Sequence, residues 1–212
     1  MKTGAVCLDL TAAYGTICHT GFLYKLSKCL PLGCVQTVVN LRRFRVHIGD
    51  DVSYWRRQAN GLLQASVLAP TLFNQYTNDL PVTHSRRFIY ADDICCALQA
   101  ETFSDIECTL TADLAHLAKY CQLWRLKPST PKTVTSVFHL HNNRSRCELN
   151  VHMNGQRLKH DPYPVYLGVT LDRTLSCTEH LSRSTAKLKS RNNLIAKLAG
   201  SLRGASASTL HT

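Results

Sequence analysis

The chain has 212 residues, of which 44% are hydrophobic and 18% are charged, so it can bury a core and is not a disordered polymer. Its 25 lysine and arginine residues outnumber 14 aspartate and glutamate residues, and the formal net charge of +11 favours a polyanionic partner such as nucleic acid or an acidic membrane face. The ten cysteines show no Cys-x-x-Cys spacing, and Asp9 interrupts the N-terminal apolar run. We therefore expect a reduced, intracellular protein of the nucleus or cytoplasm, neither secreted nor inserted in a membrane.

Hydrophobic periodicity predicts a regular series of elements along the chain. In the first third of the chain we expect a strand over 4–10, a turn over 11–15, helices over 19–29 and 35–41, a hairpin over 42–58 and a loop over 60–66. The middle third is expected to contain a helix over 67–79, a hairpin over 86–98, a helix over 105–124 and a strand over 132–140. After a polar loop over 142–146 we expect a hairpin, a strand over 165–171 and a helix over 176–199. Ser176 and Glu179 have the spacing of a capping box for the last helix. Because hairpins dominate, the pattern predicts an α+β fold with an antiparallel sheet.

The most informative acids are Asp92 and Asp93, which separate two apolar runs that should pair as strands. Aspartate is common in turns, so an ordinary turn is one interpretation. The other is a metal site, because Asp9 also lies in an otherwise apolar strand and strand-borne carboxylates can converge. Two Mg²⁺ ions about 3.5–4 Å apart would then clamp the attacking and leaving oxygens of a phosphoryl transfer.

Five segments together resemble the reverse transcriptase family, in that family's order and over roughly residues 5–200. They are Leu8-Asp9-Leu10-Thr11-Ala12-Ala13-Tyr14, Gly61-Leu62-Leu63-Gln64-Ala65-Ser66, Tyr90-Ala91-Asp92-Asp93, Lys132-Thr133 and Tyr166-Leu167-Gly168-Val169 with Asp172. The third resembles the catalytic box, the second the Gly-Leu-Pro-Gln-Gly-Ser loop, and the fifth the primer-grip region of the jockey-like enzymes of non-LTR retrotransposons. The resemblance implies an antiparallel-sheet polymerase palm with flanking helices over 1–172 and the start of a helical thumb over 173–212.

The resemblance also assigns roles to residues at matching positions. Asp9, Asp92 and Asp93 match the metal-binding acids, which implies two Mg²⁺ or Mn²⁺ ions. Tyr14 matches the aromatic residue that lies under the sugar and selects a dNTP. Gln64 and Ser66 match the loop that contacts the template and the incoming base pair.

Lys132 matches the lysine proposed to protonate the departing pyrophosphate, although a surface cation at a strand start is the other interpretation. The implied reaction is attack of a DNA primer 3′-hydroxyl on the α-phosphate of a dNTP, with RNA as template. No stable protein partner is expected.

Several departures from the family pattern predict impaired activity. The chain begins almost at the first catalytic strand, so we expect no fingers segment, and the thumb is short. Gly15 replaces an Asp, while Leu63 and Ala65 replace a Pro and a Gly of the loop. The alternative function is therefore an inactive element relic that acts at most as a nucleic-acid-binding module. For the isolated chain, these departures favour duplex binding without primer extension.

Two further patterns leave alternatives open. Residues 173–212 contain seven lysine or arginine residues and one acid, Glu179, as expected of a thumb that lies along a duplex. A second basic strip on the first hairpin could be a nucleic-acid contact or a solvated face; it comprises Arg42, Arg43, Arg45, Arg56 and Arg57. A minor rival is a zinc site, whose ligands would be His139, His141, Cys147 and His152.

Overall fold

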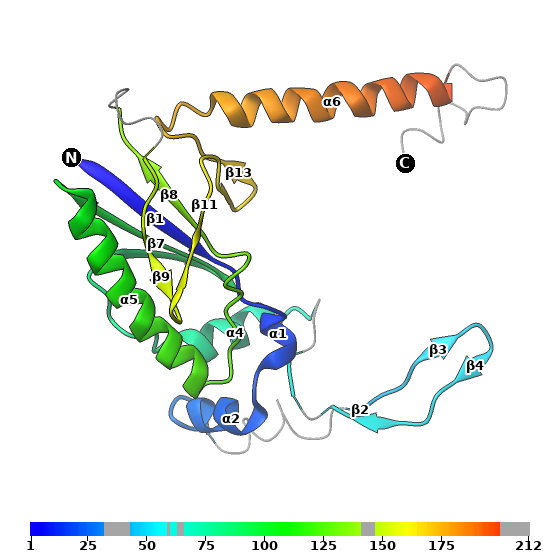
Figure 1. The fold of residues 1–212 in the computed structure, drawn as a ribbon. Coiled ribbons are helices and arrows are strands. Elements are labelled where there is room, and N and C mark those ends of the chain that lie inside the picture. The colour runs from blue at the N-terminus through cyan, green and yellow to red at the C-terminus, as the bar shows by residue number, and fades with distance from the viewer. Residues whose placement is uncertain (32–42, 59, 63–65, 141–146, 200–212) are drawn as a thin grey trace.

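A five-stranded sheet forms the centre of the molecule (Figure 1). The computed structural model describes residues 1–31, 43–58, 60–62, 66–140 and 147–199. The strand order is β11-β8-β1-β7-β6. These strands are β1 (Lys2–Leu8), β6 (Arg86–Tyr90), β7 (Asp93–Ala100), β8 (Val134–Phe138) and β11 (Lys159–His160). All neighbours are antiparallel except β11 and β8, which are parallel. The predicted α+β fold with an antiparallel sheet is confirmed for β8, β1, β7 and β6, to which β11 adds a short parallel edge strand.

One face of the sheet is covered by α5 (Phe103–Leu123), which lies across β1 and β7 (Figure 1). The predicted apolar stripe of this helix, from Ile106 to Cys121, is buried as expected. Gly4 of β1 allows this close packing: a β-carbon there would lie 2.4 Å from Ile106 Cγ2. The helix therefore packs almost directly on the backbone of the central strand.

Three helices form a second layer below the sheet end in Figure 1: α1 (Ala13–Thr16), α2 (His19–Ser27) and α4 (Ala69–Thr77). Phe22, Phe73 and Tyr76 are fully buried between them and join this layer to the core. Pro70 lies in the first turn of α4, where its missing N–H costs no helical hydrogen bond. This layer holds the chain segments that flank the end of β1.

Two parts of the chain extend from this body (Figure 1). The first is the hairpin of residues 43–57, in which β2 (Arg43–Phe44) pairs with β5 (Arg56–Arg57) and β3 (His47–Ile48) with β4 (Asp51–Val52). The second is α6 (Thr178–Ala199). We call these the hairpin arm and the helical arm. None of the described helices is long and apolar enough to cross a membrane.

Small hairpins complete the fold; they confirm one prediction and correct another. The hairpin expected after residue 146 is β9 (His152–Met153) with β10 (Gln156–Arg157). The predicted strand over 165–171 is instead a hairpin of β12 (Val165–Tyr166) and β13 (Val169–Thr170). Leu167 and Gly168 both have positive φ, 48° and 79°, and two such residues form the tight turn that reverses the chain.

The predicted capping box of the last helix is also wrong. The Ser176 amide donates to Asp172 Oδ1, and Glu179 accepts a hydrogen bond from Arg183 at 2.7 Å instead of reaching back to Ser176. Asp172, rather than Glu179, therefore accepts the hydrogen bond from the Ser176 amide. The predicted helix over 35–41 and the polar loop over 142–146 lie outside the described residues.

Candidate active site

The β6–β7 hairpin turns at Ala91 and Asp92, with Tyr90 paired to Asp93 across the strands. Asp93 is thus the first residue of β7, which corrects the prediction that both acids lie between the strands. Ala91 adopts a left-handed conformation with φ of 52°, which a non-glycine residue adopts at some energetic cost. The tight turn places two consecutive carboxylates at one end of the sheet.

Asp9 reaches the same end from the neighbouring strand. Leu8 pairs with Ile94, so Asp9 follows β1 where Asp93 begins β7. Partial desolvation raises the pKa of Asp93, and the charges of Asp92 and Asp9 raise it further. The strand register therefore brings Asp9, Asp92 and Asp93 to the same end of the sheet.

A turn after α5 holds Lys132 beside Asp9. The Ser129 amide donates to the Asp9 carbonyl at 2.8 Å, and the Lys132 amide donates to the Ser129 carbonyl at 3.1 Å. This turn places Lys132 Nζ 3.6 Å from Asp9 Oδ2, an oxygen that is buried without a hydrogen bond. The predicted lysine precedes β8 rather than lying in it and forms an ion pair with one of the acids.

Tyr14 lies on α1 next to these groups. Its ring contacts that of Phe73 on α4 at a centroid distance of 4.9 Å. Burial raises the pKa of Tyr14, and the nearby Asp92 and Tyr90 raise it further. The α1–α4 layer therefore positions an aromatic ring beside the carboxylate hairpin.

The predicted loop is anchored to the same helix. The amides of Gly61 and Leu62 donate to the carbonyls of Ile17 and Tyr14 at 2.8 and 2.7 Å. Gly61 has φ of 85°, and a β-carbon there would lie 2.8 Å from the Gly15 carbonyl oxygen, so only glycine fits without displacement. By contrast, a β-carbon on Gly15 would meet no atom within 4 Å.

Ser66 and Gln64 are the other two predicted site residues of this loop. Ser66 is half-buried just before α4, and its carbonyl accepts from the Ala69 amide at 3.1 Å. Gln64 lies outside the described residues.

The chemistry of these side chains suits a divalent cation. Carboxylate oxygens are the ligands that Mg²⁺ prefers, and the buried Oδ2 of Asp9 lacks a hydrogen-bond donor. No group of three His, Cys, Asp or Glu side chains in the described part of the chain is arranged to hold a metal. Magnesium commonly binds through one or two carboxylates with substrate phosphates, so a complete protein cage is not required. His141 of the zinc alternative lies outside the described residues.

Asp113 is a buried polar residue that the sequence reading missed. It lies on the covered face of α5 and accepts hydrogen bonds from the amides of His84 and Ser85, at 3.0 and 2.7 Å. Burial alone would raise the pKa of Asp113, but these hydrogen bonds lower it. Asp113 thus fixes the chain where it enters β6, the strand that leads to Asp92. The position of this acidic residue within the apolar stripe of α5 is the sequence feature that could have identified it.

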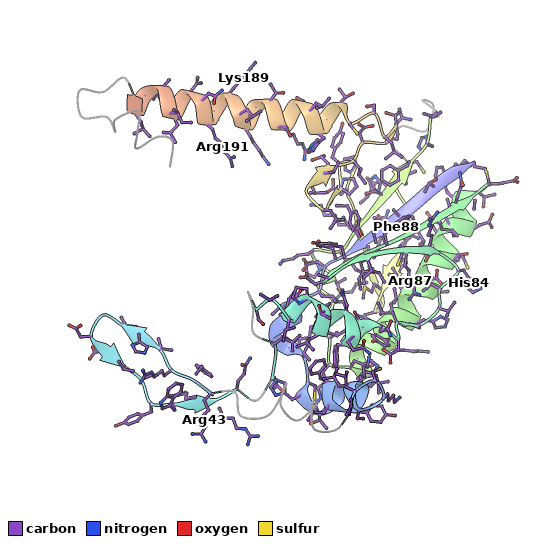
Figure 2. All side chains as sticks on the ribbon, turned by 180° about the vertical axis from the view of Figure 1, so that it is seen from behind. Arg43, His84, Arg87, Phe88, Lys189 and Arg191 are labelled. Carbon is purple, nitrogen blue, oxygen red and sulfur yellow. The ribbon has the colours of Figure 1, made fainter. Side chains whose placement is uncertain are left out.

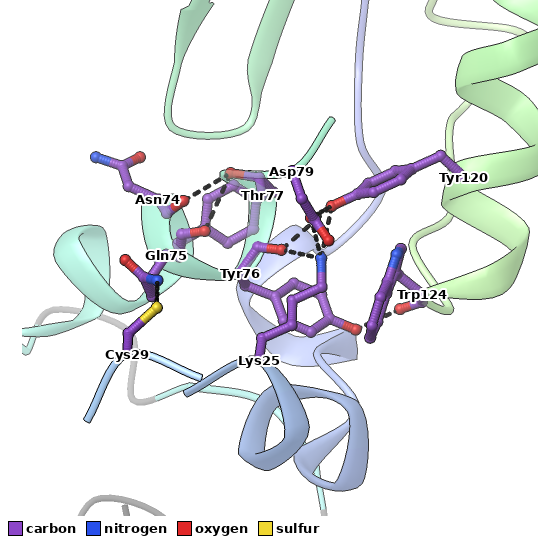
Figure 3. A network of polar contacts seen from close by, with 10 residues as sticks. Lys25, Cys29, Asn74, Gln75, Tyr76, Thr77, Asp79, Tyr120 and Trp124 are labelled. Atoms are coloured by element: carbon purple, nitrogen blue, oxygen red, sulfur yellow. Dashed lines mark hydrogen bonds and ion pairs between the residues drawn. The ribbon is translucent and has the colours of Figure 1, made fainter. Parts of the chain in front are cut away.

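Lys25 is a second buried residue that was missed (Figure 3). Its ammonium donates to the Tyr76 carbonyl, Asp79 Oδ1 and the Tyr120 hydroxyl, and it lies 3.7 Å from the ring centroid of Trp124. Burial lowers the pKa of Lys25, although the ion pair with Asp79 acts in the opposite direction. This network joins α2, α4 and α5, so it fixes the helical layer against α5.

Comparison with known proteins identifies the family to which the chain belongs. Residues 1–171 match the family described as reverse transcriptase (RNA-dependent DNA polymerase), and the chain belongs to that family. It is 29% identical over 199 residues to the probable RNA-directed DNA polymerase from transposon BS of Drosophila melanogaster, covering 88% of this chain and 22% of the relative.

A second relative belongs to the same type of element. The RNA-directed DNA polymerase from mobile element jockey of Drosophila melanogaster is 27% identical over 188 residues, covering 82% of this chain and 20% of the relative. The chain therefore spans about a fifth of the length of these relatives. The resemblance to jockey-like elements is confirmed.

Proposed function

We propose that this chain is the palm of an RNA-directed DNA polymerase of a non-LTR mobile element and adds a dNTP to a primer 3′-hydroxyl. The observation that carries the proposal is the convergence of Asp9, Asp92 and Asp93 at one sheet end, where their charges raise the pKa of Asp93. The family uses divalent metal ions. Two Mg²⁺ or Mn²⁺ ions, when bound, would neutralise the phosphate charge that develops during transfer.

Each residue of the site has a role in this proposal. Asp9, just after β1, and Asp92, in the β6–β7 turn, hold the ions, and Asp93 supplies the third acid. Tyr14 supports the sugar of the incoming dNTP, because its ring is fixed against Phe73. Lys132 donates a proton to the departing pyrophosphate in this proposal, which is supported by the position of its Nζ 3.6 Å from Asp9 Oδ2. Gln64 and Ser66 contact the template and the new base pair.

The two arms provide basic surfaces for the RNA template and the DNA primer. On the hairpin arm Arg43, Arg56 and Arg57 are exposed, and the Arg45 guanidinium lies 4.9 Å from the ring centroid of Trp55. On the helical arm Lys189 and Arg191 are exposed; Figure 2 shows them with Arg43 away from the sheet. Exposed arginines with aromatic rings suit single-stranded nucleic acid.

Arg42 lies outside the described residues. In this proposal residues 1–172 form the palm and residues 173–212 form the start of a thumb. The proposal also takes the protein to be intracellular.

Primer extension on poly(rA)/oligo(dT) with Mg²⁺ or Mn²⁺ tests the catalytic proposal. Extension that Asp92→Asn abolishes, and that Glu101→Gln preserves, supports it, because Glu101 is an exposed acid just beyond the opposite end of β7. Incorporation that persists in Asp92→Asn at the wild-type rate would contradict it.

The second candidate function is binding alone, in an element relic that has lost catalysis. The basic arms favour it, because they can bind a phosphate backbone whether or not the acids are active. Duplex binding by the wild-type chain with no extension in either metal would support this second function. The loop departures at Leu63 and Ala65 favour that outcome.

A further inference from the structure

Two cysteines face each other on the central strands of the sheet. Cys7 of β1 and Cys95 of β7 are register partners, and their sulfur atoms lie 3.6 Å apart. Residues directly opposite in antiparallel strands have Cα atoms about 4.5–5.5 Å apart, whichever kind of pair they form. That range lies inside the roughly 4.4–6.8 Å window in which a disulfide can close. The backbone therefore already has the geometry of a cross-strand disulfide.

The pair lies on the sheet face opposite α5. Gly4 of β1 packs on α5, so Cys7, three residues further along an alternating strand, points to the other face. Asp9 and Asp93 lie two residues from Cys7 and Cys95, respectively, and therefore share that face. Cys96 points the opposite way and is fully buried, so it cannot compete with Cys95 for Cys7. The dithiol is thus adjacent to the candidate active site.

The two thiols differ in access. Cys7 is half-buried, whereas Cys95 is buried. Because an oxidant from solvent reaches the more exposed sulfur more readily, Cys7 is suited to react first and Cys95 second.

We propose that Cys7 and Cys95 are a redox-active pair that hydrogen peroxide converts to an intramolecular disulfide. The Cys7 thiolate attacks one peroxide oxygen, the O–O bond breaks, and the products are a sulfenic acid and hydroxide. The Cys95 sulfur then attacks the Cys7 sulfur, the S–O bond breaks, and the thiol proton leaves with the hydroxyl as water. Overall, two thiols lose two electrons and two protons, and one peroxide is reduced to two waters. A dithiol reductant reverses the change.

Thiol mapping of the full chain tests this inference and needs no polymerase activity. The folded protein is treated with hydrogen peroxide, its remaining thiols are blocked with N-ethylmaleimide after unfolding, and the peptides are analysed by mass spectrometry. We expect a peptide pair joined through Cys7 and Cys95 that has lost two hydrogen atoms and disappears with dithiothreitol. The Cys7→Ser variant should leave Cys95 free to react with the maleimide.

Cys29→Ser is the matched control, because Cys29 is exposed and its loss also removes one thiol. This variant should still form the joined peptide. The inference would be overturned if Cys7 and Cys95 both reacted with maleimide after a treatment that oxidised Cys29 and Cys108. It would also be overturned if Cys7 reached the sulfinic acid without cross-linking. Neither result depends on primer extension, so the proposed function and this inference can fail separately.

Discussion

The body and the arms of this molecule differ in how much of their side-chain surface is buried. In the body, α5 buries an apolar stripe, interrupted by Asp113, against β1, which has Gly4 at the contact. In the hairpin arm, Tyr54 and Trp55 are 94% and 59% exposed, and every residue of its four short strands is exposed. Burial therefore explains the shape of the body but not that of the hairpin arm, whose aromatic rings and cationic side chains are exposed.

The acids of the candidate site and the exposed basic residues therefore lie in different parts of the molecule. The acids are held by the rigid sheet, where small displacements would alter their spacing. The basic residues lie on projecting segments, where they can follow an extended polyanion. Substitutions in the body should therefore change stability, and substitutions in the arms should change binding with little effect on stability.

The largest effect is expected at the contact between β1 and α5. Gly4→Ala places a methyl group 2.4 Å from Ile106 Cγ2 and 2.8 Å from Leu149 Cδ1. Overpacking of this kind costs about 2–3 kcal/mol in the free energy of unfolding, measured by urea denaturation. Gly15→Ala is the control, because its β-carbon meets no atom within 4 Å. Equal stability of Gly4→Ala and the wild type would refute the close packing.

A smaller loss is expected at Asp113. Asp113→Asn keeps one acceptor oxygen for two backbone amides and should cost about 2 kcal/mol. The native pKa of Asp113 is lowered, so its contribution is complete above the unfolded value near 4 and is lost as the pH falls through the native value. Urea denaturation between pH 7 and pH 3 should show a weaker pH dependence in Asp113→Asn. Identical pH profiles would exclude this role.

The smallest change in stability is expected in the hairpin arm. Arg57→Gln should alter the free energy of unfolding by less than about 0.5 kcal/mol, because the side chain is exposed. Its effect should appear in duplex binding, where the slope of log K against log salt falls by about one if Arg57 contacts a phosphate. Lys119→Gln, on the outer face of α5, removes the same charge from the body and should leave the slope unchanged. An equal change in both variants would remove the distinction between arm and body.

Local patterns predicted most of the fold because the elements bury regular stripes. The stripe of α5 and the two hairpins at residues 43–57 and 86–100 follow directly from apolar periodicity. The hairpin within 165–171 was missed because its turn has Leu167 beside Gly168, and leucine gives no turn signal. The acids Asp9, Asp92 and Asp93 are distinguished by the apolar runs around them, whereas the roles of Tyr14, Gln64, Ser66 and Lys132 follow only from the resemblance to a family.

The buried polar contacts could not be predicted from local patterns, since each joins distant segments. Lys25 bonds to Asp79 and Tyr120, which are 54 and 95 residues away. Cys7 and Cys95 are separated by 88 residues and meet only through strand order. Such pairs depend on topology, which hydrophobic periodicity does not specify.

The central claim is that Asp9 and Asp92 form a divalent metal site, and Mn²⁺ binding tests it most directly. Titration followed by electron paramagnetic resonance, with template–primer and dTTP present, should show protein-dependent Mn²⁺ binding in the wild type. Removing one charged ligand should weaken binding by about tenfold or more, so Asp92→Asn and Asp9→Asn should both lose affinity while Glu101→Gln retains it. Equal Mn²⁺ affinity in the wild type and Asp92→Asn would contradict the account.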